Sequence, residues 1–534
     1  MSEMSTGKVA GGVFARKSSG LVRTVSTFDT FYYCLVQLAV SFVILNIAFW
    51  VFYPGANMEI AGIFALVAAI LEGVTYGLFT SVYPRSGGEY VPLSRATHPF
   101  IGFVASFTNT FWQIYLTGVV VEQGCFWGVS PLFSMLGLQT GNQTLINLGA
   151  WFNTPPGWFA FGLGASLLFA YNLYLGMKSY FKVQKWLFSI ALICFLIFML
   201  VLVLGSTGVF DFQANFDKYF GAGAYTQVVE TARADGADLN PPMSWKYTIW
   251  FAIWPAWSFF FAVLSTAFSG EIKNVKRGQL IAIPLAQAIG GVLVILTGIF
   301  ARYAISKEGL LAVGYVGVVA PDKFPLSYPW ITLLASIMAD NPLLTIIINF
   351  AVIVMTTYVA ASTLIYGTRG LFAWALDGMA PQWLGKVSEK HRSPVNAIIA
   401  AEVVVIITMA IYSFTSLTRF LQGMAGMGVV FCVFTFSGAI FPFIKREVYE
   451  TSPARIEVFG IPLMTITGLL GTAGMGYITY RVIVDSDFGA NSPISMAMFI
   501  LVFVAGAIWY FVAREVRRRQ GIDMDKRFEE IPVE

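Results

Sequence analysis

The sequence has few charged residues, few histidines and few cysteines. Only 12% of its 534 residues are Asp, Glu, Lys or Arg, against about a quarter in soluble domains, so a soluble globular protein is excluded. The two histidines and four cysteines lack the spacing of metal ligands. We find no nucleophile elbow, phosphate-binding loop or nucleic-acid-binding motif. The sequence therefore predicts no enzyme activity, no cofactor, no metal centre and no nucleic-acid partner.

Long hydrophobic runs dominate the chain instead. Hydrophobic residues make up 57% of it, and a membrane-spanning helix needs about 20 apolar residues. Twelve such runs predict an all-α polytopic membrane protein in a lipid bilayer. The segment before the first run has no apolar core of the signal-peptide type, so we expect that run to be retained as a span. The predicted spans are 27–53, 58–83, 99–128, 156–176, 182–207, 247–270, 278–302, 341–367, 395–415, 417–444, 461–484 and 493–515.

Positive charges divide unevenly between the two sides of the predicted membrane. Most of the 33 Lys and Arg residues fall in segments on the side of both chain ends, and such segments usually face the cytoplasm. We therefore predict a multi-pass protein of the plasma membrane with cytoplasmic N- and C-termini. The long segments 209–246 and 303–340 then lie outside, with a short helix expected over 329–338. A short helical hairpin is expected in the cytoplasm over 369–391.

One extracellular asparagine carries a modification signal. Asn142 lies in a sequon with Thr144, on the predicted outer side. The sequence leaves open whether it is glycosylated, because that depends on the host.

The sixth predicted span, residues 247–270, contains an aromatic cluster around a proline. Pro255 follows Trp254 and precedes Trp257 and Ser258. Because proline has no N–H, it leaves one helical carbonyl without a donor. In hydrocarbon, that carbonyl must be satisfied by protein, water or ligand. Broken spans of this kind form the substrate site of many secondary transporters, and an ordinary proline kink is the alternative.

Four motifs carry a resemblance to a known family. They occur in order along the chain, at residues 21–29 (LVRTVSTFD), 84–90 (PRSGGEY), 270–277 (GEIKNVKR) and 369–381 (RGLFAWALDGMAP). Each resembles a signature segment of the amino acid–polyamine–organocation (APC) superfamily of permeases. Together with the twelve predicted spans, they indicate an amino acid permease-like protein of that superfamily.

The resemblance implies a LeuT-like fold, with two inverted repeats of five spans and two peripheral helices. Spans 1 and 6 would be unwound at the membrane midplane, where half-helix ends offer N–H groups to an anion and carbonyls to a cation. The implied segments are a cytoplasmic N-terminal segment (1–26), repeat 1 with spans 1–5 (27–207), an extracellular loop (208–246), repeat 2 with spans 6–10 (247–444), spans 11 and 12 (445–516) and a cytoplasmic tail (517–534).

Both unwound segments are bulkier here than in the family. The family's first-span glycine motif falls on Val40, Ser41 and Phe42, and a span-6 glycine becomes Phe261. Residues 257–259 match a W-S-F segment of agmatine–arginine exchangers. The resemblance thus implies an amino acid held in an altered way, a small apolar compound or an organic cation. The implied substrate site comprises Val40, Ser41, Phe42, Trp254, Trp257, Ser258 and Phe261.

Carboxylates and hydroxyls inside the spans are candidates for ion coupling. Glu72 and Glu122 lie in spans 2 and 3, and a charge inside the membrane costs about 2.5–3.5 kcal/mol on insertion scales. Each is a candidate H⁺ carrier or a structural group that is protonated or hydrogen-bonded. Thr356 and Thr357 of span 8 are available for a Na⁺ site, unless their hydroxyls bond back to their own helix. Ala191 stands where several proton-coupled members of the family have a lysine, so that proton route is not expected.

Two functions stay open at this point. The first is a secondary active transporter, working as a symporter, antiporter or exchanger, that moves amino acids or related organic amines by alternating access. The second is a solute sensor or a membrane-complex subunit that keeps the same fold without transport, which the bulky residues at both unwound segments motivate. The substrate, the coupling ion, the direction of flux and the oligomeric state are not predicted.

Overall fold

The computed structural model describes residues 20–38, 47–415, 425–486 and 488–531, and most of them lie in helices. Nine helices in these ranges are long and apolar enough to cross a membrane. They support a mostly helical membrane protein with several spans. In chain order they are Met58–Val82, Pro99–Thr140, Met177–Ser206, Trp245–Ala267, Val275–Ile305, Pro342–Asp377, Val395–Phe414, Ala425–Ile444 and Pro493–Arg519.

Three other predicted spans correspond to segments outside these nine. The first begins as α1 (Thr27–Gln37) and ends near η2 (Trp50–Phe52), and residues 39–46 between them lie outside the described residues. The other two are α8 (Pro155–Tyr174) and α21 (Leu463–Val484). The total of twelve spans and their division into repeats stay predictions.

Most spans are single α-helices, and two are composite. Span 3 is built from α5 (Pro99–Gly124), the π-helical turn η3 (Cys125–Val129) and α6 (Ser130–Thr140), so it continues past its predicted end. The composite sixth span contains α12, α13 and η4, described below. The single-helix spans are α3 (Met58–Val82), α9 (Met177–Ser206), α14 (Val275–Ile305), α17 (Pro342–Asp377), α18 (Val395–Phe414), α19 (Ala425–Ile444) and α22 (Pro493–Arg519).

Short elements connect the spans. Two of them test expectations for the connecting segments. The helix expected over 329–338 is confirmed as α16 (Ile331–Ala339). The hairpin expected over 369–391 is wrong, because α17 continues to Asp377 and only a 3-10 turn follows it. The remaining short elements are α4 (Tyr90–Ala96), α7 (Gln143–Trp151), α10 (Phe212–Phe220), α11 (Ala224–Ala234), η5 (Ser269–Glu271), α15 (Lys307–Val319), η6 (Pro321–Lys323), η7 (Gln382–Gly385), α20 (Arg446–Thr451), β1 (Glu457–Val458), β2 (Ile461–Pro462) and α23 (Met524–Glu529).

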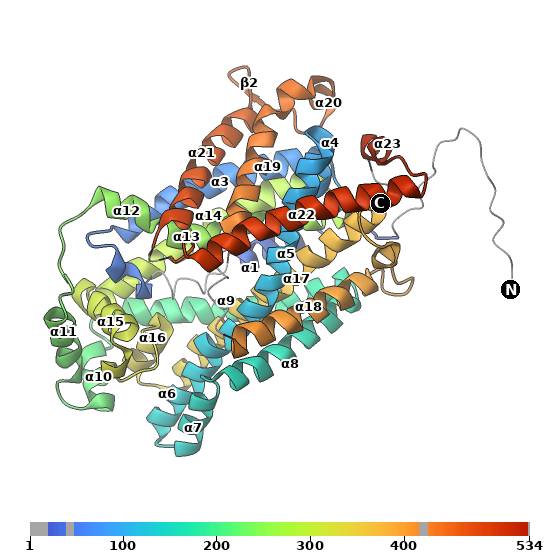
Figure 1. Ribbon diagram of the computed structural model, residues 1–534. Helices are drawn as coiled ribbons and strands as arrows, with labels where there is room; N and C mark the ends of the chain where they lie inside the picture. Colours follow the sequence, from blue (N-terminus) through green and yellow to red (C-terminus); the bar gives the residue numbers. More distant parts are fainter. Residues whose placement is uncertain (1–19, 39–46, 416–424, 487, 532–534) are drawn as a thin grey trace.

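The helix bundle has two distinct ends (Figure 1). At one end α10 packs on α16 and α11 packs on α15. At the other end lie the first and last described segments. Val25 pairs there with Ile272 in a short parallel bridge, and the Arg95 guanidinium donates to the carbonyl of Glu530. We call this second end the terminal end.

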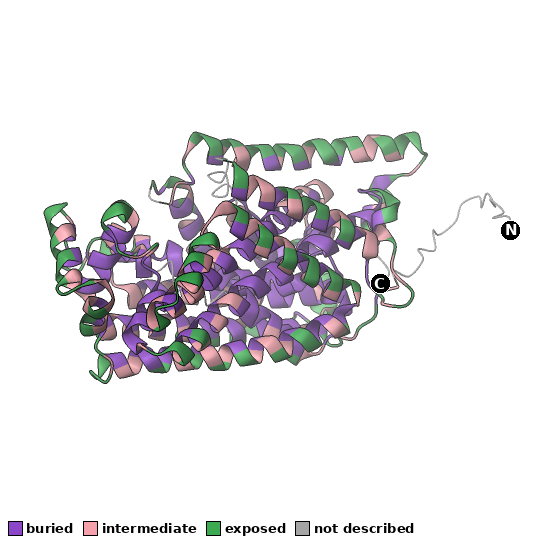
Figure 2. Cartoon of the chain, turned by 90° about the horizontal axis from the view of Figure 1, so that it is seen from below, coloured by how far each residue is buried: buried purple, intermediate pink, exposed green. Residues whose placement is uncertain are grey.

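Buried residues fill the interior of the bundle, and exposed residues cover the outward faces of its helices (Figure 2). Many of the exposed side chains are large and apolar. They form stripes on α9 and α22, among them Ile193, Leu200, Ile508 and Phe511. In water an apolar surface of this extent would drive association, so these stripes fit helices that face lipid.

The loop after the first span packs closely on the chain that leads into the sixth span. Gly55 has a φ of +76°, and its carbonyl accepts a hydrogen bond from the Ser244 N–H at 2.8 Å. A Cβ built at Gly55 would lie 2.0 Å from the carbonyl oxygen of Pro242. Only glycine therefore fits at this contact between the two spans.

Gly55→Ala is expected to lower the apparent melting temperature of the purified protein by several degrees. The matched control is Gly141→Ala, because Gly141 also has a positive φ, +66°, but nothing lies within 4 Å of its built Cβ. The control bears only the backbone strain, about 1–3 kcal/mol, whereas Gly55→Ala adds a backbone overlap. Thermal unfolding in detergent measures both variants, and equal losses would contradict the close packing at Gly55.

Candidate functional site

The sixth span is interrupted along its length. α12 (Trp245–Phe251) is followed by α13 (Ile253–Phe259), which carries Pro255 in its first turn. Because Pro255 has no N–H, it cannot donate to the carbonyl of Phe251, where α12 ends. The span then continues as η4 (Phe260–Ala267), a 3-10 helix of eight residues. A 3-10 run of this length is uncommon and often marks a functional hinge, so span 6 is broken near Pro255 as predicted.

Two glutamines of α14 satisfy polar groups along the irregular stretch. Gln287 Nε2 donates to the carbonyl of Phe259 at 3.3 Å, where the α-helix changes to 3-10 geometry. Gln279 Nε2 donates to the carbonyl of Ser265 at 3.1 Å, and Gln279 Oε1 accepts from the Ser265 hydroxyl at 2.7 Å. All four residues are fully buried. Since unpaired backbone groups are costly in apolar surroundings, these contacts stabilise the break.

Aromatic rings surround the break. The ring centroid of Trp257 lies 5.6 Å from that of Phe261 and 5.7 Å from that of Phe488. Trp254 stacks on Phe49, with centroids 4.6 Å apart. The cavity beside Trp257 and Phe261 measures only about 40 Å³, so this part of the site is closed. Three of the predicted substrate-site residues therefore lie in one aromatic cluster.

Spans 1, 6 and 8 meet next to this cluster, because α1 packs against both η4 and α17. The Tyr33 hydroxyl of α1 donates to the carbonyl of Ser362 in α17 at 2.8 Å, and Gln37 Nε2 donates to Tyr33 at 3.3 Å. Within the described ranges, the buried Ser258 hydroxyl and Gln37 Oε1 have no hydrogen-bond partner. These two atoms are polar groups that a substrate can bind.

The predicted span-1 part of the site is not placed. Val40, Ser41 and Phe42 lie in 39–46, outside the described residues. Of the seven predicted substrate-site residues, the structure therefore places Trp254, Trp257, Ser258 and Phe261 only.

The four motifs that carry the family resemblance converge at the terminal end. The N–H of Val25, from the first motif, donates to the carbonyl of Glu271 in the third motif at 3.0 Å. The N–H of Gly87, from the second motif, donates to the carbonyl of Ala267 at the end of η4 at 2.8 Å. A side chain of the fourth motif, Arg369, pairs with Glu271. Residues far apart in the sequence thus close one end of the bundle.

A buried carboxylate, Glu89, lies at the centre of this end. It accepts hydrogen bonds from the hydroxyls of Tyr76 and Tyr366 and from the amide of Asn109. Tyr366 approaches it over Gly88, where a φ of +61° and a Cβ only 2.5 Å from the Tyr366 hydroxyl leave room for glycine alone. Burial raises the pKa of Glu89 above its ordinary value, although these hydrogen bonds oppose the rise. The network joins α3, α5 and α17.

Two buried ion pairs flank Glu89. Arg369 Nε lies 2.9 Å from a Glu271 carboxylate oxygen, with side-chain exposures of 0% and 2%. Arg95 Nη1 lies 2.8 Å from an Asp377 carboxylate oxygen, with exposures of 3% and 0%. A buried charge is tolerated only when it is paired, so each pair holds two segments of the terminal end together.

The two predicted proton carriers lie in different surroundings. Glu122 accepts a hydrogen bond from the Ser413 hydroxyl at 2.8 Å and packs against Gly162 of α8. It therefore lies between α5, α8 and α18 and is not brought to the aromatic cluster. Glu72 is fully buried on α3, which packs directly on α13 and η4. Among the described residues, neither carboxylate oxygen of Glu72 has a hydrogen-bond partner.

The two span-8 hydroxyls that are candidates for a Na⁺ site also differ in their hydrogen bonding. The Thr357 hydroxyl donates to the carbonyl of Ile353 in its own helix at 2.7 Å, and its methyl group faces Gly124. The Thr356 hydroxyl is buried, and no partner for it is found within the described ranges. Thr356 is thus the hydroxyl of this pair that is free to bind an ion.

Sequence reasoning missed the residues of the terminal end as site residues. Glu89, Glu271 and Arg369 lie inside the quoted motifs but just outside the predicted spans, so no burial is predicted for them. One sequence feature could have identified the two glutamates. Each directly follows glycine, as in Gly87-Gly88-Glu89 and Gly270-Glu271. Small residues next to a charge allow neighbouring backbones to enclose it.

The apolar helices and the interrupted sixth span define a multi-pass membrane protein with a closed central region. A family model described as Amino acid permease matches residues 25–507. The chain therefore belongs to the amino acid permease family, and the resemblance to the APC superfamily is confirmed. Family membership indicates a transporter of amino acids or related compounds, and not an enzyme. The comparison with curated proteins gives no match.

Arg369→Met is expected to destabilise the protein by about 3–5 kcal/mol, because it leaves the Glu271 carboxylate buried without its partner. The double variant Arg369→Met/Glu271→Met is expected to recover much of that loss. Arg233→Met is the control, since Arg233 pairs with Glu308 at an exposed site and such pairs contribute little. Thermal unfolding of all three variants is the measurement. A double variant as unstable as Arg369→Met would refute the buried pair.

Glu89 is expected to make stability fall as the pH rises. Its folded-state pKa is raised, so its contribution is fully present below the unfolded value of about 4.3 and is lost as the pH rises through the higher folded-state pKa. Glu89→Gln removes this dependence, so its melting temperature should rise relative to that of the native protein as the pH increases above about 4.3. Glu230→Gln, at an exposed carboxylate, should run parallel to the native protein. Parallel curves for Glu89→Gln would exclude the proposed titration.

Proposed function

We propose that this protein is a secondary active transporter that moves an amino acid or a related organic amine across the plasma membrane by alternating access. The proposal includes twelve spans arranged as two inverted repeats of five with two peripheral helices, and cytoplasmic N- and C-termini. Family membership supports the transport of a small molecule. The positions of Val25, Arg95 and Glu530 at one end of the bundle support termini on the same side.

The observation that carries the proposal is the break in span 6. Next to it lie the buried Ser258 hydroxyl, for which the described residues supply no hydrogen-bond partner, and the half-buried Trp257 ring. A hydroxyl binds the polar head of an amino acid, and an indole face binds an ammonium group. We propose that these two groups, with Trp254, Phe261 and the span-1 residues 40–42, form the central substrate site.

The terminal end fits the role of an inner gate. In alternating access, one side of the membrane must be sealed while the other is open. The Glu89 network joins segments from both proposed repeats, and the Arg369–Glu271 pair joins two segments of repeat 2. We propose that these contacts seal the cytoplasmic side and separate when the site opens inward.

Glu72 is the proton-carrier candidate favoured over Glu122. It is buried without a hydrogen-bond partner in the described part of the chain, on a helix that packs on the broken span. Glu122 is already bonded to Ser413 at a distance from that span. Thr356 is favoured over Thr357 for Na⁺ by the same reasoning. Experiment decides whether transport is coupled to H⁺, coupled to Na⁺ or an exchange.

The alternative is a solute sensor or a membrane-complex subunit with the same fold. The small cavity beside Trp257, about 40 Å³, favours the membrane-complex subunit, because a full amino acid needs more room. A sensor would instead bind a solute without flux.

Purified protein in liposomes is expected to take up or exchange a labelled amino acid or amine. Ser258→Ala should reduce uptake at low substrate concentration about fivefold, the effect of one lost hydrogen bond of about 1 kcal/mol. Ser81→Ala is the matched control, because the buried Ser81 hydroxyl donates to Leu78 of its own helix at 2.6 Å. Its uptake should equal that of the native protein.

Three outcomes separate the two functions. Flux that Ser258→Ala reduces and Ser81→Ala leaves unchanged supports the transporter and the site. Flux that is unchanged in both variants removes Ser258 from the site. Inert liposomes across a broad panel of amino acids and amines, with binding still detected by a thermal shift, would favour the sensor.

A further inference from the structure

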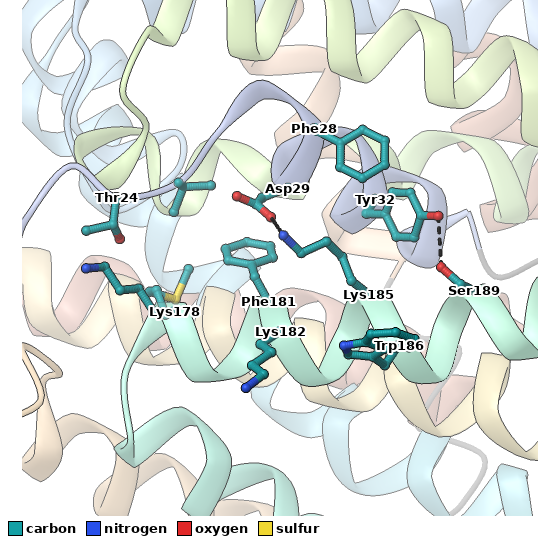
Figure 3. A pocket seen from close by; sticks show the side chains of 12 residues that line it. Thr24, Phe28, Asp29, Tyr32, Lys178, Phe181, Lys182, Lys185, Trp186 and Ser189 are labelled. Carbon is teal, nitrogen blue, oxygen red and sulfur yellow. Dashed lines mark hydrogen bonds and ion pairs between the residues drawn. The ribbon is translucent and has the colours of Figure 1, made fainter.

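A second cavity, separate from the proposed central site, lies between the start of α1 and the first four turns of α9 (Figure 3). Its volume is about 620 Å³, within the range of small-molecule sites. α1 contributes Phe28, Asp29 and Tyr32 to its lining, and α9 contributes lysines and Trp186. The cavity lies at the terminal end of the bundle, where span 1 and span 5 begin.

The cavity carries a net positive charge. Lys178, Lys182 and Lys185 line it, and Asp29 is the one carboxylate that does so in the described part of the chain. Asp29 is already engaged, because it pairs with Lys185 at 2.8 Å and accepts hydrogen bonds from Ser26. Within the described ranges no ion pair is found for Lys178 or Lys182. Two ammonium groups are therefore available to an anion.

The two free lysines are neighbours on one face of α9, but their side chains extend in different directions. Figure 3 shows Lys178 and Lys185 extending toward α1, whereas Lys182 extends away from it. Lys178 and Lys182 are separated by one helical turn, about 6 Å along the axis. An anionic group at the mouth of the cavity can be reached by both side chains, since each lysine is long and exposed.

The lipid-facing stripe of α9 begins directly after the lysines. Trp186 is 69% exposed, and it is followed on the exposed surface by Ile190, Ile193, Leu196 and Leu200. Tryptophan prefers the membrane interface, where its ring meets both acyl chains and headgroups. The order along α9 is therefore lysine, tryptophan, apolar stripe. It matches the order of phosphate, glycerol and acyl chain in a phospholipid.

We propose that this cavity binds the headgroup of an anionic glycerophospholipid. The phosphate lies against Lys178 and Lys182, and the acyl chains run along the exposed face of α9. A free anion would use the lysines but neither Trp186 nor the apolar stripe, so the arrangement favours a lipid. The site is independent of the substrate, and it assumes only that α9 spans the bilayer.

The test uses the full chain in neutral detergent, with phosphatidylglycerol as the probe and native mass spectrometry as the measurement of affinity. Phosphatidylglycerol should bind more tightly than phosphatidylcholine with the same acyl chains. Lys178→Gln/Lys182→Gln should bind phosphatidylglycerol about 10- to 30-fold more weakly, since a basic residue near the membrane surface contributes about 1 kcal/mol. Lys178→Arg/Lys182→Arg should bind as the native protein does.

The matched control is Lys386→Gln/Lys390→Gln, which removes the same charge from exposed positions outside the cavity. It should retain the native affinity. Trp186→Ala should weaken phosphatidylglycerol binding without a change of charge. All variants are first compared without lipid by thermal unfolding, and their exposed positions predict native melting temperatures.

Two results would overturn the proposal. Equal losses of affinity in the Lys178/Lys182 and Lys386/Lys390 variants would show a general surface-charge effect. Displacement of bound phosphatidylglycerol by millimolar inorganic phosphate, with Trp186→Ala unchanged, would show a site for a free anion and not for a lipid.

Discussion

The structure depends on the pairing of polar groups that have been removed from water. Arg369 and Glu271 are almost completely buried, and the cost of burying either charge alone exceeds what a single hydrogen bond returns. Their pairing, with the Glu89 network beside it, fixes how four distant segments of the chain meet. The same requirement acts on the backbone of span 6, where Gln279 and Gln287 supply the partners that a regular helix would not need.

The two regions that follow from this requirement are connected through one segment. η4 leaves the aromatic cluster at Phe261 and reaches Ala267, whose carbonyl accepts from Gly87 of the terminal end. The proposed substrate site and the terminal end are therefore connected directly along the chain. Glu89 and its three donors, by contrast, link neighbouring helices sideways. Residues of span 6 thus connect the two regions along the chain, whereas Glu89 and its donors connect neighbouring helices.

Much of the architecture could be predicted from the sequence, because long apolar runs can only be spans and Pro255 must break a helix. The short helix α16 and the family were predicted as well. The length of α17 could not be predicted, because charged residues such as Arg369 and Asp377 interrupt the apolar run and their partners are distant in sequence. For the same reason no burial is predicted for Glu89. Its burial depends on Tyr366, Asn109 and Tyr76, which are distant in sequence, so no local pattern reveals it.

In its 3-10 geometry η4 is longer than the same residues would be in an α-helix. Eight residues rise about 16 Å in a 3-10 helix and about 12 Å in an α-helix. Rewinding this segment as an α-helix would shorten it by about 4 Å, more than the length of a hydrogen bond. Glu271 lies four residues after η4, so a change in the length of η4 acts on the segment that carries the Arg369–Glu271 pair.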